Sequence, residues 1–541
     1  MSATGEAAAP AGSQPESAQR AAARNTALFS AWTGVSRVVG LLREIVFASY
    51  FGTGPAASAF TIAFLVPNFV AQLFANAALG AAFVPVFTDL LQRERRQEAF
   101  RLASTLFWIM LLALSMVTAF FILLAGVIMP LFIGPELAHV PGATDLTVGL
   151  SQVLFPVVLL LGVNGLLLAI LQSYDRFGVQ AISPVLWNLA ILVLLIVLHP
   201  LFHGEKGIYA FAIGVLVATC LQLAIAFGAL GRIDFRLQFQ IDWHDPRVRH
   251  VFMLMLPVTV GLGIVNLDQL INSAFGTLVS SEAPRAIENA FRVYMLPQGM
   301  FSVAVATVLF PIMSRMASRS DVASMRRTIG SGLRQINLLL IPAAAFLLVL
   351  TVPVVRLLFE RGHFNAKSTE SVSIALFWFA FSLPFGGVNL LLTRAFFAVR
   401  RPWIPTSLAA VNMAVDIVVS LALYKPFGIA GLVIGTLSAN VVMTALQLRR
   451  LRIGFNGRLE GAKTTMITAR ICVASALLAG VSYIVWYLLD SLLGRSLTAQ
   501  IVSVGAAGLA GVWVYVRCVL AMRIPEAHQV HQLIVSRLGR A

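Results

Sequence analysis

The chain has 541 residues, of which 59% are hydrophobic and only 11% are charged, and its mean hydropathy is +0.87. Soluble domains carry about 25% charged residues, so this composition indicates an integral membrane protein and argues against a soluble enzyme. The formal net charge of +16 would favour a nucleic-acid partner in a soluble protein, but basic loops also set the orientation of membrane proteins.

Residues 1–25 are rich in Ala, Gly, Ser and Pro and are predicted to form a disordered cytoplasmic tail. About 20 apolar residues cross a bilayer, and by this measure the following sequence predicts fourteen transmembrane helices. In chain order, these cover residues 27–52, 56–91, 102–133, 146–172, 180–199, 207–230, 250–279, 284–314, 328–358, 370–397, 404–423, 428–448, 466–489 and 498–522. Residues 523–541 are predicted to form a second cytoplasmic tail. The fold class is therefore an all-α polytopic membrane protein.

The loops between these helices alternate in their content of basic residues. The loop after the second helix contains Arg93, Arg95, Arg96 and Arg101, and basic residues recur after every even-numbered helix. The opposite loops hold only six basic residues, which are Lys206, Arg285, Arg361, Lys367, Lys425 and Arg495. Because basic loops remain in the cytoplasm, both termini are expected there, and the positive charge requires no nucleic acid.

An internal repeat divides most of the chain into two halves. The stretch LLREIVFASYFGT (41–53) aligns with VNLDQLINSAFGT (265–277) at an offset of 224, and Asn188 aligns with Asn412 at the same offset. We therefore expect two pseudo-symmetric six-helix lobes, with the last two helices outside the repeat. The predicted N-lobe, C-lobe and helix pair cover residues 26–231, 232–452 and 453–522. Such parallel repeats are typical of transporters, whose binding site lies between the lobes.

Several charged residues lie inside the apolar segments, where each costs about 2.5–3.5 kcal/mol by insertion scales. These residues are Arg37, Arg43, Glu44, Asp268, Arg292, Arg334, Arg394 and Asp416. Arg334 and Arg394 are expected to extend to the cytoplasmic boundary of their helices. The others are expected to face a water-filled cavity or to pair with one another.

The stretch SRVVGLLRE begins at Ser36 and includes Arg37, Arg43 and Glu44, and Arg292 lies in the second lobe. Arginine binds phosphate oxygens in a bidentate manner. We therefore take these five residues as candidates for binding a pyrophosphate-linked substrate in a shared cationic cavity. Structural ion pairing between the arginines and nearby carboxylates remains the alternative.

A second group of polar residues lies in the second lobe. Asn412 and Asp416 share one face of a helix, and Asp268 and Thr436 lie at a similar depth. Carboxylate, amide and hydroxyl oxygens suit a hard cation, so these four residues are candidates for Na⁺ or H⁺ coupling. The alternative is an interhelical hydrogen-bond network with a protonated aspartate. The membrane potential is a third source of energy, and no other cofactor is expected.

Five stretches of the chain are similar to one known family when taken as a set. They are SRVVGLLRE, AFTIAFLVPN, FANAALGAAFVPVF, NAFRVYMLPQGMFSVAVATVLFP and FERGHF. Over residues 25–522 the chain resembles the MurJ (MviN) family of lipid II flippases, in the MOP exporter superfamily. The resemblance implies that lipid II moves from the inner to the outer leaflet of the bacterial inner membrane by alternating access, in peptidoglycan biosynthesis.

The resemblance also implies roles for particular positions. Arg37, Arg43 and Arg292 match arginines directed at the substrate's pyrophosphate, and the last two helices match a groove for the undecaprenyl tail. The four oxygen-bearing residues of the second lobe resemble sodium-coordinating positions of some members. The expected partners are the undecaprenyl-pyrophosphate-linked disaccharide-peptide and membrane lipids, with the chain acting as a monomer.

The chain departs from the family pattern at four positions. After the PN of the second helix the family usually has arginine, whereas Ala71 and Gln72 stand here, and Ser58 and Asn76 replace acidic residues. Three alternatives are also open: export of another polyprenyl-pyrophosphate oligosaccharide, an enzyme acting on the same lipids, and a non-transporting membrane scaffold, which the missing second-helix arginine supports. The enzyme is the least favoured, because the outer loops contain no acid–base constellation.

Overall fold

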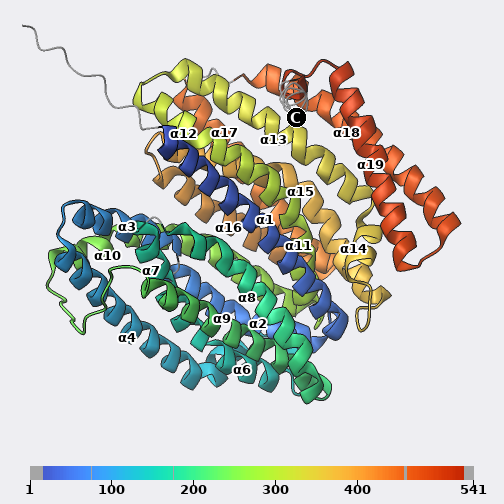
Figure 1. Ribbon diagram of the computed structural model, residues 1–541. Coiled ribbons are helices and arrows are strands. Elements are labelled where there is room, and N and C mark those ends of the chain that lie inside the picture. The colour runs from blue at the N-terminus through green and yellow to red at the C-terminus, as the bar shows by residue number, and fades with distance from the viewer. Residues whose placement is uncertain (1–15, 75, 175, 456–459, 529–541) are drawn as a thin grey trace, which may run out of the picture.

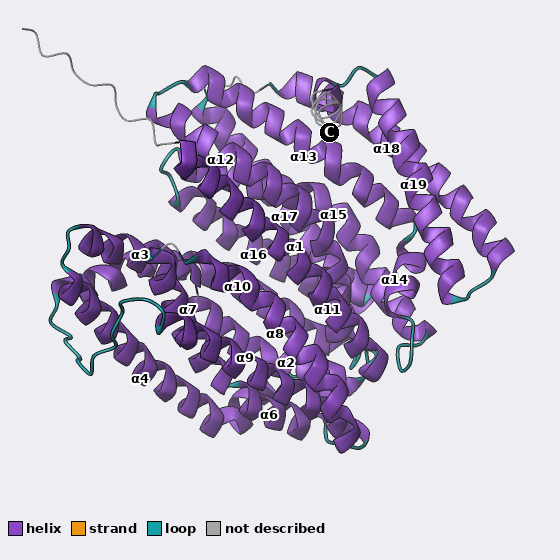
Figure 2. Ribbon diagram, viewed as in Figure 1, coloured by secondary structure: helices purple, strands orange, loops and turns teal. Residues whose placement is uncertain are grey.

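The computed structural model describes residues 16–74, 76–174, 176–455 and 460–528. Within these ranges the regular structure is entirely helical, as Figure 2 shows, and no strand is formed. The helices form two inclined stacks, with the last two helices along the outer side of one stack (Figure 1). The predicted all-α fold class is confirmed.

The N-lobe helices have four short helical turns between them, and in Figure 1 most of these helices form the lower stack while α1 runs along the upper one. The bounds of the long helices are α1 Glu16–Phe51, α2 Pro55–Phe74, α3 Asn76–Gln92, α4 Arg96–Ile128, α6 Ala143–Leu154, α7 Pro156–Ser173, α8 Phe177–Leu198 and α9 Ile208–Leu230. The short turns cover Met129–Phe132, Pro135–Ala138 (α5), His199–Leu201 and Gly204–Gly207.

The C-lobe and the final helix pair follow. The C-lobe contains α10 Pro246–Val279, α11 Ala283–Pro297, a π-helical turn Gln298–Ser302, α12 Val303–Ser318, α13 Val322–Val349, α14 Thr351–Phe359, α15 Ala366–Ala398, α16 Trp403–Phe427 and α17 Ile429–Gly454. The pair consists of α18 Gly461–Leu493 and α19 Leu497–Ala521.

Four of the predicted segments are each divided into two helices. They are 56–91, 146–172, 284–314 and 328–358. In two of them proline marks the division: α7 begins at Pro156, and the π-helical turn follows Pro297. Proline lacks a backbone N–H and its ring clashes with the preceding turn, so an apolar segment that reads as one span is broken or widened there.

Twelve helical segments among the described residues are long and apolar enough to cross a membrane. The other two predicted spans correspond to α1 and α10, which are 36 and 34 residues long. At 1.5 Å per residue both exceed the roughly 30 Å of a bilayer core. The predicted count of fourteen therefore fits the structure.

The predicted tails differ from the structure at their inner boundaries. Helix α1 begins at Glu16, inside the range 1–25 that was predicted to be disordered, and residues 1–15 lie outside the described residues. At the other end, Ile524 and Ala527 are buried in a cluster with α13, α18 and α19. That part of the predicted tail therefore packs on the protein, and residues 529–541 lie outside the described residues.

The packing of the helices repeats between the two lobes. Helix α1 packs against α8 as α10 packs against α16, and the pairs α8–α9 and α7–α9 recur as α16–α17 and α15–α17. The pair α18–α19 packs on the C-lobe through α13. The predicted pair of pseudo-symmetric lobes with an added helix pair therefore matches the observed contacts.

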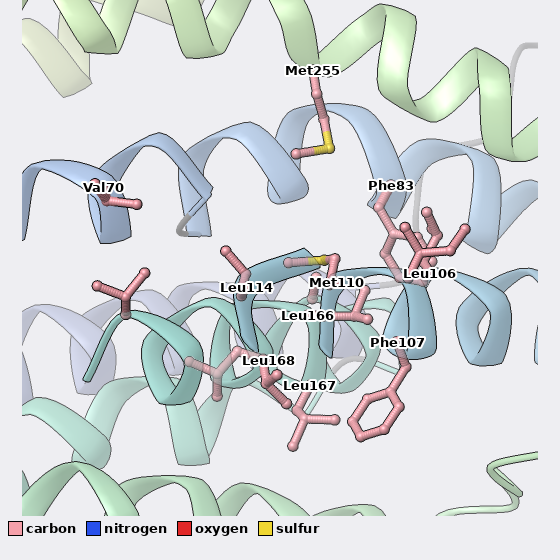
Figure 3. Close-up of a cluster of buried hydrophobic side chains, with 14 of the residues drawn as sticks. Val70, Phe83, Leu106, Phe107, Met110, Leu114, Leu166, Leu167, Leu168 and Met255 are labelled. Atoms are coloured by element: carbon pink, nitrogen blue, oxygen red, sulfur yellow. The ribbon is translucent and has the colours of Figure 1, made fainter. Parts of the chain in front are cut away.

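Each lobe has its own hydrophobic core, and α1 and α10 each place side chains in the core of the opposite lobe. Figure 3 shows part of the N-lobe core, where Leu106 and Met110 of α4 lie near Leu166 of α7, and Met255 reaches in from α10. Phe47 of α1 belongs to an N-lobe cluster, whereas the next residue, Ala48, belongs to the C-lobe core. These two helices therefore carry side chains from one lobe to the other.

Candidate functional site

A cavity of about 630 Å³ lies between the lobes. Its wall comes from α1, α2, α7, α8 and α9 on one side and from α10 and α11 on the other. All five predicted substrate-binding residues line it: Ser36, Arg37, Arg43, Glu44 and Arg292. The structure thus brings together the residues that the sequence singled out, in the predicted position between the lobes.

Glu44 lies at the centre of a cluster of guanidinium groups. Its Oε1 accepts a hydrogen bond from Arg43 at 2.5 Å, and its Oε2 accepts one from Arg285 at 2.6 Å. The Nε of Arg292 lies 3.9 Å from the same carboxylate, and Arg292 also pairs with Glu288 at 2.7 Å. Glu44 is only 3% exposed. Burial of a carboxylate is costly unless opposite charges surround it, and here three arginines do so.

Arg37 differs from the other cavity arginines because no described acidic side chain lies within ion-pair distance of it. It sits seven residues before Glu44 on α1, which corresponds to about 10 Å along the helix. A Cβ added to Gly299, in the π-helical turn of the C-lobe, would lie 2.8 Å from the Arg37 Cζ atom. The absence of a side chain at position 299 therefore leaves room for the guanidinium.

The charged side chains in the cavity wall give it a positive balance. Four guanidinium groups, on Arg37, Arg43, Arg285 and Arg292, face two carboxylates, on Glu44 and Glu288, which leaves a net charge of +2. The remaining wall contains aliphatic side chains together with amide and aromatic ones, among them Asn68, Gln72, Gln269, Phe60 and Trp187. The arginines therefore form ion pairs, as the structural hypothesis predicts, and they do so in a cavity that keeps a positive charge, as the substrate-binding hypothesis predicts.

Arg285 is a cavity residue that the sequence analysis missed. It was assigned to the loops opposite the basic side, but it is only 3% exposed and its guanidinium lies 3.9 Å from the centre of the Phe47 ring. The spacing of seven residues between Arg285 and Arg292 places both on one face of α11. That spacing was the available signal.

The candidate cation-binding residues are only partly assembled. Asp416 is buried, and its carboxylate accepts hydrogen bonds from Asn272 at 2.7 Å, Ser420 at 3.0 Å and Thr436 at 3.2 Å. One carboxylate oxygen of Asp268 is buried without a hydrogen-bond partner in the described part of the chain. Asn412 lies one turn from Asp416, and no hydrogen bond joins it to the described residues of this network.

The chemistry of this group favours a small hard cation or a proton. Asn272 and Ser420 were not predicted, and they use the same oxygens of Asp416 that a cation would need. No group of three or more His, Cys, Asp or Glu side chains among the described residues could hold a metal ion. The buried, unpartnered oxygen of Asp268 is the feature that fits a Na⁺ ligand or a protonated carboxyl.

Arg334 does not extend into solvent at the cytoplasmic boundary, although the snorkelling hypothesis predicted that it would. Its side chain is buried and pairs with two carboxylates, Glu460 at 2.9 Å and Glu526. The segment after α19 folds back against α13 and brings Glu526 to this arginine, and the apolar pattern of one helix cannot show such a return. Arg394 is exposed, with its guanidinium 5.7 Å from the Phe310 ring.

The structure also locates the departures from the family pattern. Gln72 lies in the cavity wall, whereas Ala71 is buried in the N-lobe. Ser58 is fully buried, and its hydroxyl has no partner among the described residues. The side chain of Asn76 lies outside the described part of the structure.

A second cavity, of about 740 Å³, lies between the C-lobe and the final helix pair. Apolar and aromatic side chains from α14, α15 and α18 form most of its wall, including Val352, Phe377, Trp378 and Trp486. Polar side chains from the ends of these helices complete the wall, namely Arg356, Glu360, Glu370 and Arg495. Of the final helix pair, α18 contributes Tyr483 and Trp486 to the wall.

The two repeated lobes, the cationic cavity between them and the membrane-spanning helices define a membrane transporter. A family model described as "Lipid II flippase MurJ" matches residues 47–502. The probable lipid II flippase MurJ of Rhizobium meliloti is 30% identical over 454 residues, which cover 83% of this chain and 84% of the relative. The lipid II flippase MurJ of Burkholderia cenocepacia is 27% identical over 419 residues, covering 76% and 80%. The chain belongs to the MurJ family of lipid II flippases.

Solved structures are similar in fold. A structure described as lipid II flippase MurJ in an inward closed conformation has a TM-score of 0.75 at 21% identity, covering 92% of this chain and 99% of the other. An inward-facing MATE multidrug resistance transporter of the MOP superfamily has a TM-score of 0.64 at 14% identity, covering 79% and 96%. The predicted MOP-type architecture is therefore confirmed. A flippase is a transporter rather than an enzyme.

Proposed function

We propose that this chain moves lipid II, the undecaprenyl-pyrophosphate-linked disaccharide-peptide, from the inner to the outer leaflet of a bacterial inner membrane. The observation that carries the proposal is the cavity with a net charge of +2 and walls from both lobes. A diphosphate is the most highly charged part of this substrate, and guanidinium groups bind phosphate oxygens better than any other side chain. Membership of the family supports the choice of substrate.

Within the cavity, Arg37 is the first candidate for contact with the diphosphate because it has no carboxylate partner among the described residues. Arg43 and Arg292 already share Glu44, so they can accept a second anion only by exchanging or sharing partners. The undecaprenyl tail would remain in the apolar cavity beside α18. Both termini would lie in the cytoplasm, on the side of the arginine-rich loops, and a monomer would suffice because one chain supplies the whole cavity wall.

Transport also needs a step that returns the empty protein to its starting state. We place this step at the carboxylates Asp268 and Asp416, whose oxygens would hold Na⁺ or a proton, with Thr436 as a further ligand. The membrane potential is the alternative source of energy. In either case the inward-facing and outward-facing states must bind the substrate or the cation with different affinities. A ligand that binds both states equally cannot shift the equilibrium between them.

One further function is compatible with the same cavity. Another polyprenyl-pyrophosphate oligosaccharide would present the same diphosphate to the four guanidinium groups. A non-transporting scaffold was favoured only by the missing arginine at Ala71 and Gln72. Arg285 weakens that argument, because it adds a guanidinium to the cavity that the sequence analysis did not count.

The test is complementation of a bacterium depleted of its lipid II flippase. We expect the wild type to restore growth, and Arg37→Ala, Arg43→Ala and Arg292→Ala each to reduce transport at least tenfold. Loss of one charge-assisted hydrogen bond is worth about 1.5–3 kcal/mol. Arg394→Ala, an exposed arginine in the same lobe as Arg292, is the matched control and should rescue fully. Equal rescue by all variants would contradict the cavity assignment, and failure of the wild type would contradict the substrate.

A further inference from the structure

We propose that the buried ion pair between Glu44 and Arg285 is a latch between the lobes, which an incoming diphosphate releases by competing with Glu44 for Arg285. This inference rests on the proposed function, because it assigns the moving step to the same cavity. Glu44 lies on α1 and Arg285 on α11, and 241 residues separate them in the chain. Their side chains are 4% and 3% exposed, so the pair is shielded from screening by water and salt.

The latch lies two turns from a set of contacts between the end of α1 and the C-lobe, which we call the closed end. Two turns beyond Glu44, α1 ends at Phe51, and the chain there contacts the segment between α14 and α15. Thr53 donates a hydrogen bond to Ser368 at 2.7 Å, and the backbone N–H of His363 donates to the carbonyl oxygen of Ser49 at 2.9 Å. This closed end is the one opposite the start of α1.

The approach of the two backbones at the closed end is close. Gly52 has a φ of 59°, and a Cβ at this position would collide with the backbone oxygen of His363. Only glycine adopts this conformation without strain. Separation of the lobes must therefore break the close backbone contact between Gly52 and His363 as well as the Glu44–Arg285 ion pair.

Two arginines that bind Glu44 each have a buried N–H donor without an acceptor among the described residues. The Nε atoms of Arg285 and Arg43 are both buried, and neither has a hydrogen-bond partner in the described part of the chain. A buried donor without an acceptor is destabilising. A diphosphate has more oxygen acceptors and more negative charge than the single carboxylate of Glu44. It can therefore satisfy these donors and displace Glu44 from them.

Movement of Arg285 would directly break its contacts with two residues of α1, Phe47 and Glu44. Its guanidinium stacks 3.9 Å from the centre of the Phe47 ring, and Phe47 packs into the N-lobe cluster. When a diphosphate draws Arg285 toward the cavity, α1 loses both this cation–π contact and the ion pair. The hydrogen bonds that remain between the lobes at this end, among them Thr53–Ser368, Ser49–His363 and Gly134–Thr277, then act without the buried ion pair.

The test measures closure by cross-linking and does not depend on transport. The three native cysteines are replaced by serine, and Thr53→Cys and Ser368→Cys are introduced so that a disulfide reports the closed end. In the purified full-length protein in lipid nanodiscs, we expect fast cross-linking that inorganic pyrophosphate slows at least fivefold. In the Arg285→Gln background, we expect cross-linking to be at least fivefold slower without ligand and unchanged by pyrophosphate.

Lys367→Gln is the matched control. Lys367 pairs with Glu282 at 2.9 Å near the same end, but both residues belong to the C-lobe, so cross-linking and its response to pyrophosphate should match those of the wild type. Arg285→Lys keeps the charge without the bidentate fork and should restore part of the closure. Glu44→Gln tests the same latch from α1 if Arg285→Gln does not fold.

Two results would overturn the latch. One is wild-type cross-linking in Arg285→Gln or Glu44→Gln, and the other is an equal response to pyrophosphate with and without Arg285. Either result leaves the proposed function standing if the wild type still supports growth in the flippase-depleted strain. Conversely, suppose that the wild type shows the expected cross-linking and yet fails to support growth. That result would support a diphosphate-sensitive latch and exclude lipid II as the substrate.

Discussion

The buried ion network around Arg334 offers a sharp test of how the C-terminal segment is held. Arg334 of α13 donates to Glu460, just before α18, at 2.9 Å and pairs with Glu526 after α19. The Arg334 and Glu526 side chains are 5% and 3% exposed, and one oxygen of Glu526 already lacks a partner among the described residues. Arg334→Ala therefore leaves two carboxylates facing each other with no cation between them.

The expected cost follows from this burial. Removal of one partner from a buried ion pair costs about 3–5 kcal/mol, because the remaining charge has lost both water and its counter-ion. The free energy for local opening of the segment around Glu526 should fall by that amount. Since about 1.4 kcal/mol corresponds to a factor of ten, protection of its amides from hydrogen exchange should fall by roughly two to three and a half orders of magnitude.

Hydrogen exchange measured by mass spectrometry in detergent provides the readout. The amides of Ile524 and His528, which donate to Val519 and Ile524, report on this segment. Arg470→Ala is the control, because Arg470 is exposed and makes one hydrogen bond to the carbonyl of Met522. We expect at most about a tenfold effect from that variant. Exchange in Arg334→Ala within threefold of the wild type, or no faster than in the control, would refute the reasoning.

Two other predictions concern the cavity and the candidate cation site. Asp416→Asn keeps the size of the side chain but removes the charge that Asn272, Ser420 and Thr436 surround. Any dependence of transport on Na⁺ or on the proton gradient should therefore disappear. Unchanged dependence in vesicle transport assays would exclude the site. Gly299→Ala should displace the Arg37 guanidinium and reduce complementation, whereas Gly34→Ala, where an added Cβ meets no other atom within 4 Å, should rescue as the wild type does.

Much of the fold could be predicted because its signals are local. A run of apolar residues long enough to cross a bilayer must form a helix in lipid, where every backbone polar group needs an internal partner. The alternation of basic loops and the offset of 224 residues between Asn188 and Asn412 then supplied the topology and the lobes. Divided helices were missed where one apolar run hides a break, as before Pro156 and between Val349 and Thr351.

The candidate site was predictable only in part. Arg37, Arg43, Glu44 and Arg292 are conspicuous because charges within apolar helices need a cavity or a partner, and the structure places all four in one cavity wall. Arg285 was missed because it lies near a helix end, where a charge costs little, so that only its spacing of seven residues from Arg292 indicated a shared face. Arg285 becomes a candidate only in the folded protein, where it binds Glu44 on another helix.

The sequence by itself determined which segments are helical, which side of the membrane the loops favour and which helices carry charge, because hydropathy and charge act along a single helix. Only the tertiary structure decided which charges meet. Glu44 and Arg285 are 241 residues apart, and Arg334 and Glu526 are 192 apart. Such pairs depend on how α1 crosses α11 and on how the segment after α19 returns to α13, and no local pattern encodes either arrangement.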